Sequence, residues 1–243
     1  MKNLKRIIKN LIVRLTTIDW FDFIYLHSSV PIAKNINHDN WIDYIVELID
    51  KEGMRVLEIG SREVVNSSLR NKFKHAEYIG FDYYSGDNVD VVGDVHKLST
   101  YFDKKFDLIF SSAVFEHLAM PWIASEEIVK MLNVGGYVFV ETHYSFSSHE
   151  RPWHFFQFSE NALKVLFNPM LGIQCIEAGC SNPIAGRFTR YASKYLRNNP
   201  VTGLYCHSEF LGQKVREVSD FDWKKVSLSD IVSDTVYPKP IDS

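Results

Sequence analysis

Short apolar runs alternate with amphipathic stretches over the first 142 residues of the chain. The five runs cover residues 54–59, 78–81, 89–92, 106–111 and 136–141, and the first four end at or just before a glycine, an aspartate or a serine. Apolar runs of this length are typical of parallel strands that are buried on both faces. Helical spacing of apolar residues lies before and between the runs, at residues 37–50 and 122–132. This order predicts βαβ units and a mostly parallel sheet.

The pattern is less regular beyond residue 142. A polar and aromatic segment over residues 143–158 predicts a loop. The other expected elements are helices at 159–167 and 184–197, strands at 172–178 and 203–215, and a surface tail from residue 220. Since the chain has no internal repeat and no low-complexity linker, we expect an N-terminal helical extension (1–50), one α/β domain (51–218) and a C-terminal tail (219–243).

The first 17 residues have the pattern of a basic amphipathic helix. Apolar side chains recur at helical spacing on one face: Leu4, Ile7, Ile8, Leu11, Ile12 and Leu15. Lys9 and Arg14 interrupt any apolar core of a signal peptide, and no small-residue cleavage site follows. Two interpretations remain. The helix packs on the domain or on a partner chain, which we prefer, or it makes peripheral contact with an anionic membrane surface.

Composition excludes several classes of protein. The 243 residues are 46% hydrophobic and 23% charged, which is close to the globular average and argues against disorder or a coiled coil. A net charge of −3 argues against a dedicated nucleic-acid binder. The three cysteines form no CxxC pair and are too few for a disulfide framework, so we expect a cytoplasmic location. No stretch approaches the ~18 uninterrupted apolar residues of a membrane span.

Polar residues stand where the expected parallel strands end. In an open α/β sheet, ligands bind beyond the carboxyl ends of the strands. Gly60 after the first strand permits a tight turn and close approach of the backbone. Asp82, after the second strand, is placed to accept both hydroxyls of a ribose, and Asp94, after the third, can accept the exocyclic amine of an adenine. These positions predict a nucleoside site, although either aspartate alone could be a turn or cap residue.

Five segments in this order resemble the successive motifs of class I S-adenosylmethionine-dependent methyltransferases. They are VLEIGSR (56–62), YIGFD (78–82), VVGDVHKL (91–98), FDLIFSSAVFEHL (106–118) and LNVGGYVFVETH (132–143). The resemblance implies S-adenosylmethionine as cofactor. It also implies a Rossmann-like three-layer αβα sandwich, with a mostly parallel seven-stranded sheet whose last strand is antiparallel.

The resemblance also implies roles for individual residues in cofactor binding. Asp82 would hold the ribose, and Asp94 with the Val95 amide would read the adenine. The remaining expected cofactor-binding residues are Glu58, Gly60 and Ser61 at the methionine part, Tyr83 beside Asp82, and Ser112 and His117 at the methionine end and the sulfonium.

The loop after Gly60 departs from the family pattern. The family usually has further glycines here, whereas this chain has Arg62 and Val64. S-adenosylmethionine has no pyrophosphate, so the loop need not approach a bulky diphosphate. The same departure argues against a nicotinamide dehydrogenase, which needs the G-x-G-x-x-G pattern.

The segment after the fifth strand carries the candidate acceptor chemistry. Thr142-His143, His149 and Pro152-Trp153 resemble a bacterial branch of uncharacterised or sugar-modifying methyltransferases, although His154 stands where an acid is expected. A hydroxyl acceptor benefits from a base, and histidine is the best suited near neutral pH. We consider His149 first and His143 second, with packing roles as the alternative. The histidines and Glu150 match no tight metal motif, so no metal site is predicted.

These observations predict an S-adenosylmethionine-dependent O-methyltransferase acting on a small or glycan-linked hydroxyl. Four basic residues of the expected helix at 184–197 could meet a phosphate or nucleotide-sugar acceptor, or simply form a solvated face: Arg187, Arg190, Lys194 and Arg197. An RNA methyltransferase is disfavoured by the net charge and by Ser111-Ser112-Ala113-Val114 in place of an N-P-P-Y-like motif. Arg62 motivates the alternative of a non-catalytic methyltransferase-like scaffold, and an oligomer is possible.

Overall fold

A computed structural model describes residues 4, 7–8, 19–63 and 68–231. The chain divides into two compact units. The small unit comprises residues 1–30 and 183–205, and the sheet unit comprises residues 31–182 and 206–243. Apart from Leu4, Ile7 and Ile8, which are helical, the expected N-terminal helix lies outside the described residues, as does the end of the tail beyond residue 231. Among the described residues, no helix is long and apolar enough to cross a membrane.

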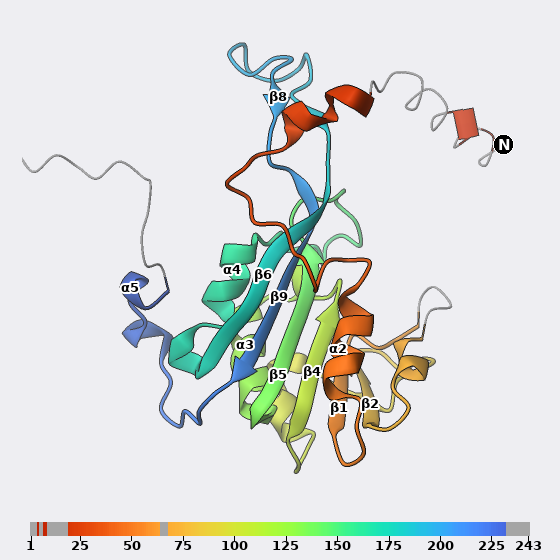
Figure 1. Cartoon of the computed structure of the whole chain (residues 1–243), viewed down its shortest axis with the longest axis vertical. Coiled ribbons are helices and arrows are strands. Elements are labelled where there is room, and N and C mark those ends of the chain that lie inside the picture. Colours follow the sequence, from red (N-terminus) through yellow and green to blue (C-terminus); the bar gives the residue numbers. More distant parts are fainter. Residues whose placement is uncertain (1–3, 5–6, 9–18, 64–67, 232–243) are drawn as a thin grey trace, which may run out of the picture. The chain divides into compact units, whose positions relative to one another are not determined.

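The sheet has seven strands in the order β3-β2-β1-β4-β5-β9-β6 (Figure 1). Their bounds are Arg55–Ile59 (β1), Glu77–Asp82 (β2), Val91–Val92 (β3), Phe106–Ser112 (β4), Leu132–His143 (β5), Ile173–Pro183 (β6) and Tyr205–Lys214 (β9). The pairs from β3 through β5 are parallel, and β9 pairs with β5 antiparallel. The expected fold class, a mostly parallel seven-stranded sheet whose last strand is antiparallel, is confirmed.

Strand register brings the predicted site residues to one edge of the sheet. Ile59 pairs with Phe81 on one side and with Ser111 on the other. The residues that directly follow Ile59, Phe81 and Ser111 therefore lie side by side at the carboxyl edge of the sheet. On the other side of β5, His143 pairs with His207 of β9. The carboxyl edge of the sheet thus continues from the nucleoside positions to a region rich in histidine.

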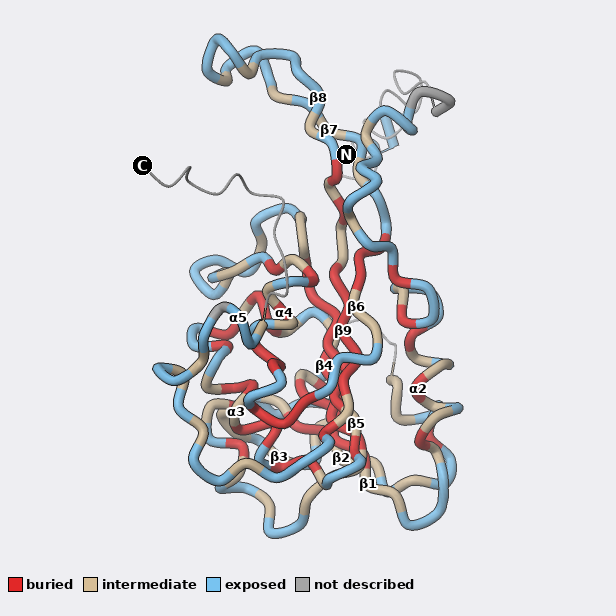
Figure 2. The backbone as a smooth tube through the Cα atoms, turned by 60° about the vertical axis from the view of Figure 1, so that its left-hand side comes forward, coloured by how far each residue is buried: buried red, intermediate tan, exposed pale blue. Residues whose placement is uncertain are grey.

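Helices cover both faces of the sheet (Figure 2). The α-helices of the described chain are α2 (Trp41–Ile49), α3 (Pro121–Met131), α4 (Glu160–Leu166) and α5 (Leu228–Ile231). Short 3-10 segments are η1 (Asp19–Tyr25), η2 (Leu69–Lys72), η3 (Val95–Thr100), η4 (Phe115–His117), η5 (Pro169–Leu171) and η6 (Trp223–Lys225). Trp41 of α2 stacks on Phe139 of β5, with ring centroids 4.6 Å apart, and both residues belong to one of the two hydrophobic cores. The second core lies on the opposite face, against α3 and α4.

The predicted helix at 184–197 is wrong. Residues 186–187 (β7) and 200–201 (β8) instead form a two-stranded antiparallel sheet. Main-chain hydrogen bonds between Phe188 and both Asn198 and Asn199 hold the start and end of the connecting segment together. Asn198 has a φ of 62°, a left-handed turn conformation that asparagine tolerates. These turn residues before Pro200 outweigh the helical spacing of the preceding segment.

Candidate active site

The turn after β1 requires glycine at position 60. Gly60 has a φ of 83°, and a Cβ atom there would lie 2.2 Å from Cγ2 of Val114. The amides of Gly60 and Ser61 both donate to the carbonyl of Phe81, at 2.8 and 3.2 Å. The backbone therefore turns sharply between two strand ends. Ser61 Oγ is buried here and has no hydrogen-bond partner among the described residues.

Asp82 lies at this turn, as the sequence predicts. Its carboxylate accepts hydrogen bonds from the amides of Tyr84 (2.9 Å) and Arg62 (3.2 Å). Arg62 Nε also lies 3.7 Å from Asp82 Oδ1, and the Arg62 guanidinium stands 5.8 Å from the centre of the Tyr84 ring. Ribose hydroxyls at Asp82 would compete with Arg62 for the same carboxylate oxygen.

Asp94 begins η3 and caps it. Its Oδ1 accepts from the amide of His96 at 3.0 Å and lies 2.7 Å from His96 Nδ1. Burial alone would raise the pKa of Asp94, but the hydrogen bonds from His96 outweigh it and lower the pKa. Asp94 is therefore an ionised acceptor, as recognition of an amine requires. The Val95 side chain is buried in the core, so only its main chain is available to a ligand.

Glu58 is buried between β1 and β2. The hydroxyl of Tyr78 and the side-chain amide (Nδ2) of Asn88 donate to its Oε2. Burial is the main cause that raises the pKa of Glu58 to about 8, against the opposing effects of Asn88 and Arg70. At neutral pH this carboxyl group is mostly protonated, so it reaches the site as a neutral hydrogen-bonding group.

The predicted residue Tyr83 lies between the two parts of the site. Its side chain is exposed, and its ring centre is 6.1 Å from that of Trp153. Trp153 belongs to the loop over residues 143–158, and main-chain hydrogen bonds join this loop to residues at or near the strand ends. The amides of Phe155 and Phe156 donate to the carbonyl of Glu116, and the amide of Phe158 donates to that of His143. The nucleoside positions and the acceptor loop are therefore neighbours.

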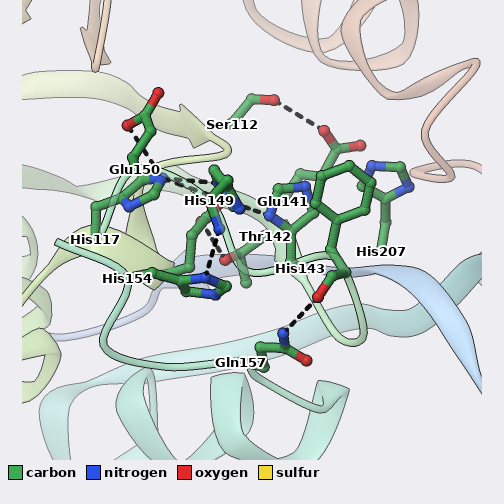
Figure 3. A network of polar contacts seen from close by, with 12 residues as sticks. Ser112, His117, Glu141, Thr142, His143, His149, Glu150, His154, Gln157 and His207 are labelled. Atoms are coloured by element: carbon green, nitrogen blue, oxygen red, sulfur yellow. Dashed lines mark hydrogen bonds and ion pairs between the residues drawn. The ribbon is translucent and has the colours of Figure 1, made fainter. Parts of the chain in front are cut away.

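A second group of polar residues lies at the ends of β4, β5 and β9 (Figure 3). Ser112 Oγ donates to Glu141 Oε1 at 2.8 Å, and His38 Nδ1 lies 2.8 Å from Glu141 Oε2. The His38 ring stacks on His207 with centroids 4.1 Å apart. The bond to Glu141 raises the pKa of His38, whereas burial lowers the pKa of His207. The sequence predicts Ser112 alone of these residues.

Glu116 is the buried charge of the site. It has no exposed surface, accepts a hydrogen bond from Thr142 Oγ1 at 2.7 Å, and its Oε1 lies 2.6 Å from His143 Nδ1. That last contact is an ion pair by distance, although the two atoms are not aligned for a hydrogen bond. Burial would raise the pKa of Glu116, but His143 and Thr142 outweigh it and lower the pKa. Glu116 thus holds a negative charge beside a candidate base.

His117 and His149 face each other through their Nε2 atoms, 3.2 Å apart. The Nδ1 atom of His117 lies 3.0 Å from the carbonyl of Trp153, and that of His149 lies 2.9 Å from the carbonyl of Ser147. A carbonyl oxygen only accepts, so each Nδ1 carries a proton and each neutral ring has its lone pair on Nε2. Two lone pairs at this distance repel each other, so the pair is suited to take up a proton or another cation between the two rings. Glu116 Oε1 lies 3.9 Å from His117 Nε2 and can stabilise the resulting positive charge.

His154 completes the group of histidines. The amide of His149 donates to His154 Nδ1 at 3.3 Å, and the two ring centres are 4.7 Å apart. Partial burial and the neighbouring histidines His149 and His117 lower the pKa of His154. The structure therefore brings together His117, His143 and His149, which the sequence proposes for different parts of the site, and adds His154 as a neutral neighbour.

Some of these side chains have the geometry of metal ligands. Within the described residues, three overlapping sets place their ligand atoms within 4.8 Å of one another: His143–Cys206–His207, His38–Glu141–His207 and Glu116–His143–His149. Imidazole and carboxylate ligands suit zinc and other late divalent metals. Most of these groups also have a polar partner within the chain, although Glu116 Oε1 and His143 Nδ1 form no hydrogen bond among the described residues. The expectation of no metal site stays a prediction.

Strand-end residues fit an adenosine-containing cofactor by three observations. The Gly60 turn leaves no room for a side chain, Ser61 offers a buried hydroxyl with no partner in the described part of the chain, and Asp94 is ionised. The Arg62–Asp82 ion pair is a contact that such a ligand would have to displace.

Comparison with known proteins supports this assignment. No curated protein matches the chain. Solved structures that resemble it include a chain assigned to the methyltransferases in a complex with the Haloferax volcanii Trm112 methyltransferase activator (18% identity, 73% of this chain and 90% of that one, TM-score 0.50). They also include the YcgJ protein of Bacillus subtilis (16% identity, 73% and 98%, TM-score 0.50). At these identities the likeness establishes the fold alone.

Residues 34–179, which are more than half of the chain, match the profile of a methyltransferase domain family. The chain therefore belongs to this methyltransferase domain family, and its cofactor is S-adenosylmethionine.

Proposed function

We propose that this methyltransferase acts on a hydroxyl oxygen of a small or glycan-linked acceptor. The observation that carries the proposal is the histidine pair His117–His149, which faces Glu116 beside the strand-end edge. Bound S-adenosylmethionine supplies an electrophilic methyl group on a sulfonium. A neutral hydroxyl is a weak nucleophile, so a site that methylates oxygen benefits from a positioned base.

His149 takes the proton of the acceptor in this proposal. His149 Nε2 of the neutral ring carries a lone pair and receives the hydroxyl proton as the oxygen takes the methyl group. His117 Nε2, 3.2 Å away, shares the proton, and Glu116 stabilises the charge that develops on the two rings. His143 is held by Glu116 and is the second candidate for the same step.

Exposed aromatic rings beside the histidines favour an acceptor with a ring. Phe146 stacks on His143 with centroids 4.4 Å apart, and the side chains of Phe146, Trp153 and Phe155 are all exposed. Rings near convergent polar groups are typical of sites that bind a small molecule on one apolar face. A sugar or a phenol has both the apolar face and the hydroxyl.

Two measurements test the proposal. Titration calorimetry should show one S-adenosylmethionine per chain, and release of S-adenosylhomocysteine should identify an acceptor among nucleotide-sugars, glycolipid precursors and small phenols. Absence of binding at millimolar cofactor would end the proposal.

A non-catalytic scaffold is the second candidate. The Arg62–Asp82 ion pair favours it, because Arg62 contacts the carboxylate that ribose needs. Cofactor binding without turnover over the whole panel, together with a biological function that tolerates His149→Ala, would support the scaffold instead.

A further inference from the structure

Charge is divided unevenly between the two units of the chain. The small unit, residues 1–30 and 183–205, has nine lysines and arginines and two aspartates, a formal charge of +7. The sheet unit has 18 basic and 28 acidic residues, a formal charge of −10. The net charge of −3 conceals this division. Five of the nine basic residues lie outside the described residues, and the other four belong to the segment 183–205. A local excess of one sign attracts surfaces of the opposite sign.

Contacts within the small unit make its two segments one body. The amide of Gly203 donates to the carbonyl of Tyr25 at 2.7 Å. Gly203 has a φ of 73°, and a Cβ atom there would lie 3.0 Å from Cβ of His27. The segment that contains η1 and the segment of β7 and β8 therefore present their side chains from the same unit.

The basic side chains of the second segment are free of acidic partners. Arg187, Arg190, Lys194 and Arg197 are all exposed, and within the described residues none of them forms an ion pair. Arg190 donates to the hydroxyl of Tyr191 at 2.8 Å, and Arg197 donates to the carbonyl of Ala192 at 2.8 Å. These bonds orient the cations and leave their charges uncompensated.

Large apolar and aromatic side chains accompany these cations. Tyr191 and Tyr195 are 81% and 79% exposed. The other exposed apolar side chains of the small unit are Leu4, Ile7, Ile8, Phe23, Ile24 and Leu26. Exposed apolar side chains that gather on one small unit are typical of a surface that meets a partner.

We propose that the small unit docks on an anionic phospholipid bilayer. Lysine and arginine near such a surface are each attracted to it, and tyrosine is typical of the interface between headgroups and acyl chains. Aliphatic side chains such as Ile7, Ile24 and Leu26 gain from insertion among acyl chains, whereas a nucleic acid offers them little apolar surface. The proposal concerns binding and stands independently of the proposed methyl transfer.

Vesicle sedimentation of the full chain tests the proposal. The wild type should sediment with phosphatidylcholine vesicles that contain 30% phosphatidylglycerol, and not with pure phosphatidylcholine. The variant Arg190→Glu/Lys194→Glu/Arg197→Glu should bind at least about tenfold more weakly, because each basic residue adds to the attraction. Tyr191→Ser/Tyr195→Ser should weaken binding without changing its dependence on salt.

Matched control variants come from the sheet unit. Lys51, Lys74 and Lys224 are exposed and belong to the oppositely charged unit, so Lys51→Glu/Lys74→Glu/Lys224→Glu makes the same change of net charge. This control should bind anionic vesicles as the wild type does, and all variants should keep their affinity for S-adenosylmethionine.

Three outcomes would overturn the proposal. They are no binding to anionic vesicles, equal losses in the two charge-reversal variants, or binding to an RNA oligonucleotide or to a second copy of the chain in place of vesicles. The second-copy outcome would appear in light scattering as a dimer that the Arg190→Glu/Lys194→Glu/Arg197→Glu variant lacks.

Discussion

The two ends of the candidate active site are built in different ways. At the nucleoside end, Gly60, Asp82 and Asp94 stand within two residues of a strand end, and their contacts are local, as from Asp94 to His96, or join the ends of neighbouring strands, as from Arg62 to Asp82. At the acceptor end, the contacts join distant segments. His38 meets Glu141 across 103 residues, and His117 meets His149 across 32. The first end follows from the topology of a parallel sheet, and the second depends on how a long loop folds back.

The difference also separates binding from chemistry. The nucleoside end offers a tight backbone turn and an ionised carboxylate, which hold a ligand without moving a proton. The acceptor end offers paired histidines and a buried glutamate, which can hold and move one. Substitutions at the nucleoside end should therefore change the Kd for S-adenosylmethionine, and substitutions at the acceptor end should change kcat.

The largest expected effect is on turnover at the acceptor end. His149→Ala should lower kcat by about 10²- to 10⁴-fold, the usual contribution of a general base, and leave the Kd for S-adenosylmethionine unchanged. Steady-state kinetics with calorimetry measure both constants. His75→Ala, an exposed histidine elsewhere in the sheet unit, is the control and should leave kcat unchanged. An unchanged kcat in His149→Ala would remove this residue from the mechanism.

The next effect is on cofactor binding at the nucleoside end. Asp82→Ala should weaken binding of S-adenosylmethionine at least about 100-fold, because hydrogen bonds to a charged acceptor are each worth about 1.5–3 kcal/mol. Asp87→Ala, an exposed aspartate five residues away, is the matched control for calorimetry. Equal affinities of the two variants would mean that Asp82 is a turn residue.

Glu58 should make stability depend on pH. Its pKa is about 8 in the folded chain and about 4.5 in the unfolded one, so the folded state binds more protons between these values. This carboxyl group therefore reduces stability as the pH rises from about 4.5 to about 8. Between pH 5.5 and 7, the free energy of unfolding of Glu58→Gln should rise relative to the wild type by about 2 kcal/mol. Parallel curves of denaturant unfolding for the two proteins across this range would contradict the assignment.

Removal of Arg62 should have a smaller effect on cofactor binding, and this effect is opposite in sign to that of Asp82→Ala. Removing its ion pair with a partly exposed carboxylate is worth about 0–1 kcal/mol. Arg62→Ala should therefore tighten S-adenosylmethionine binding by up to about fivefold in calorimetry. Weaker binding would show that Arg62 clamps the cofactor instead of competing with it.

Removal of metal should have no effect. Since the proposed proton transfer uses His149, His117 and Glu116 and needs no metal, dialysis against a chelator should leave kcat as it was. Loss of activity that added zinc restores would make Glu116, His143 and His149 a metal centre.

The sequence predicts the positions of the strand-end residues for a physical reason, and their roles in binding stay predictions. Parallel strands carry the residues that follow them to one edge, so Gly60, Asp82 and Asp94 can be placed from strand ends alone. Glu116, His38 and His207 were missed, because their partners depend on strand register and loop closure that no local pattern encodes. The helix expected at 184–197 failed for a related reason, since turn residues at its end overrode its spacing.

The account is tested most directly by the position of the transferred methyl group. Turnover of ¹³C-methyl-labelled S-adenosylmethionine with the acceptor found in the panel, followed by heteronuclear NMR of the product, identifies the atom that receives the label. We expect the label on oxygen and its loss in His149→Ala. A methyl group on nitrogen or carbon, or cofactor binding with no labelled product, would contradict the account.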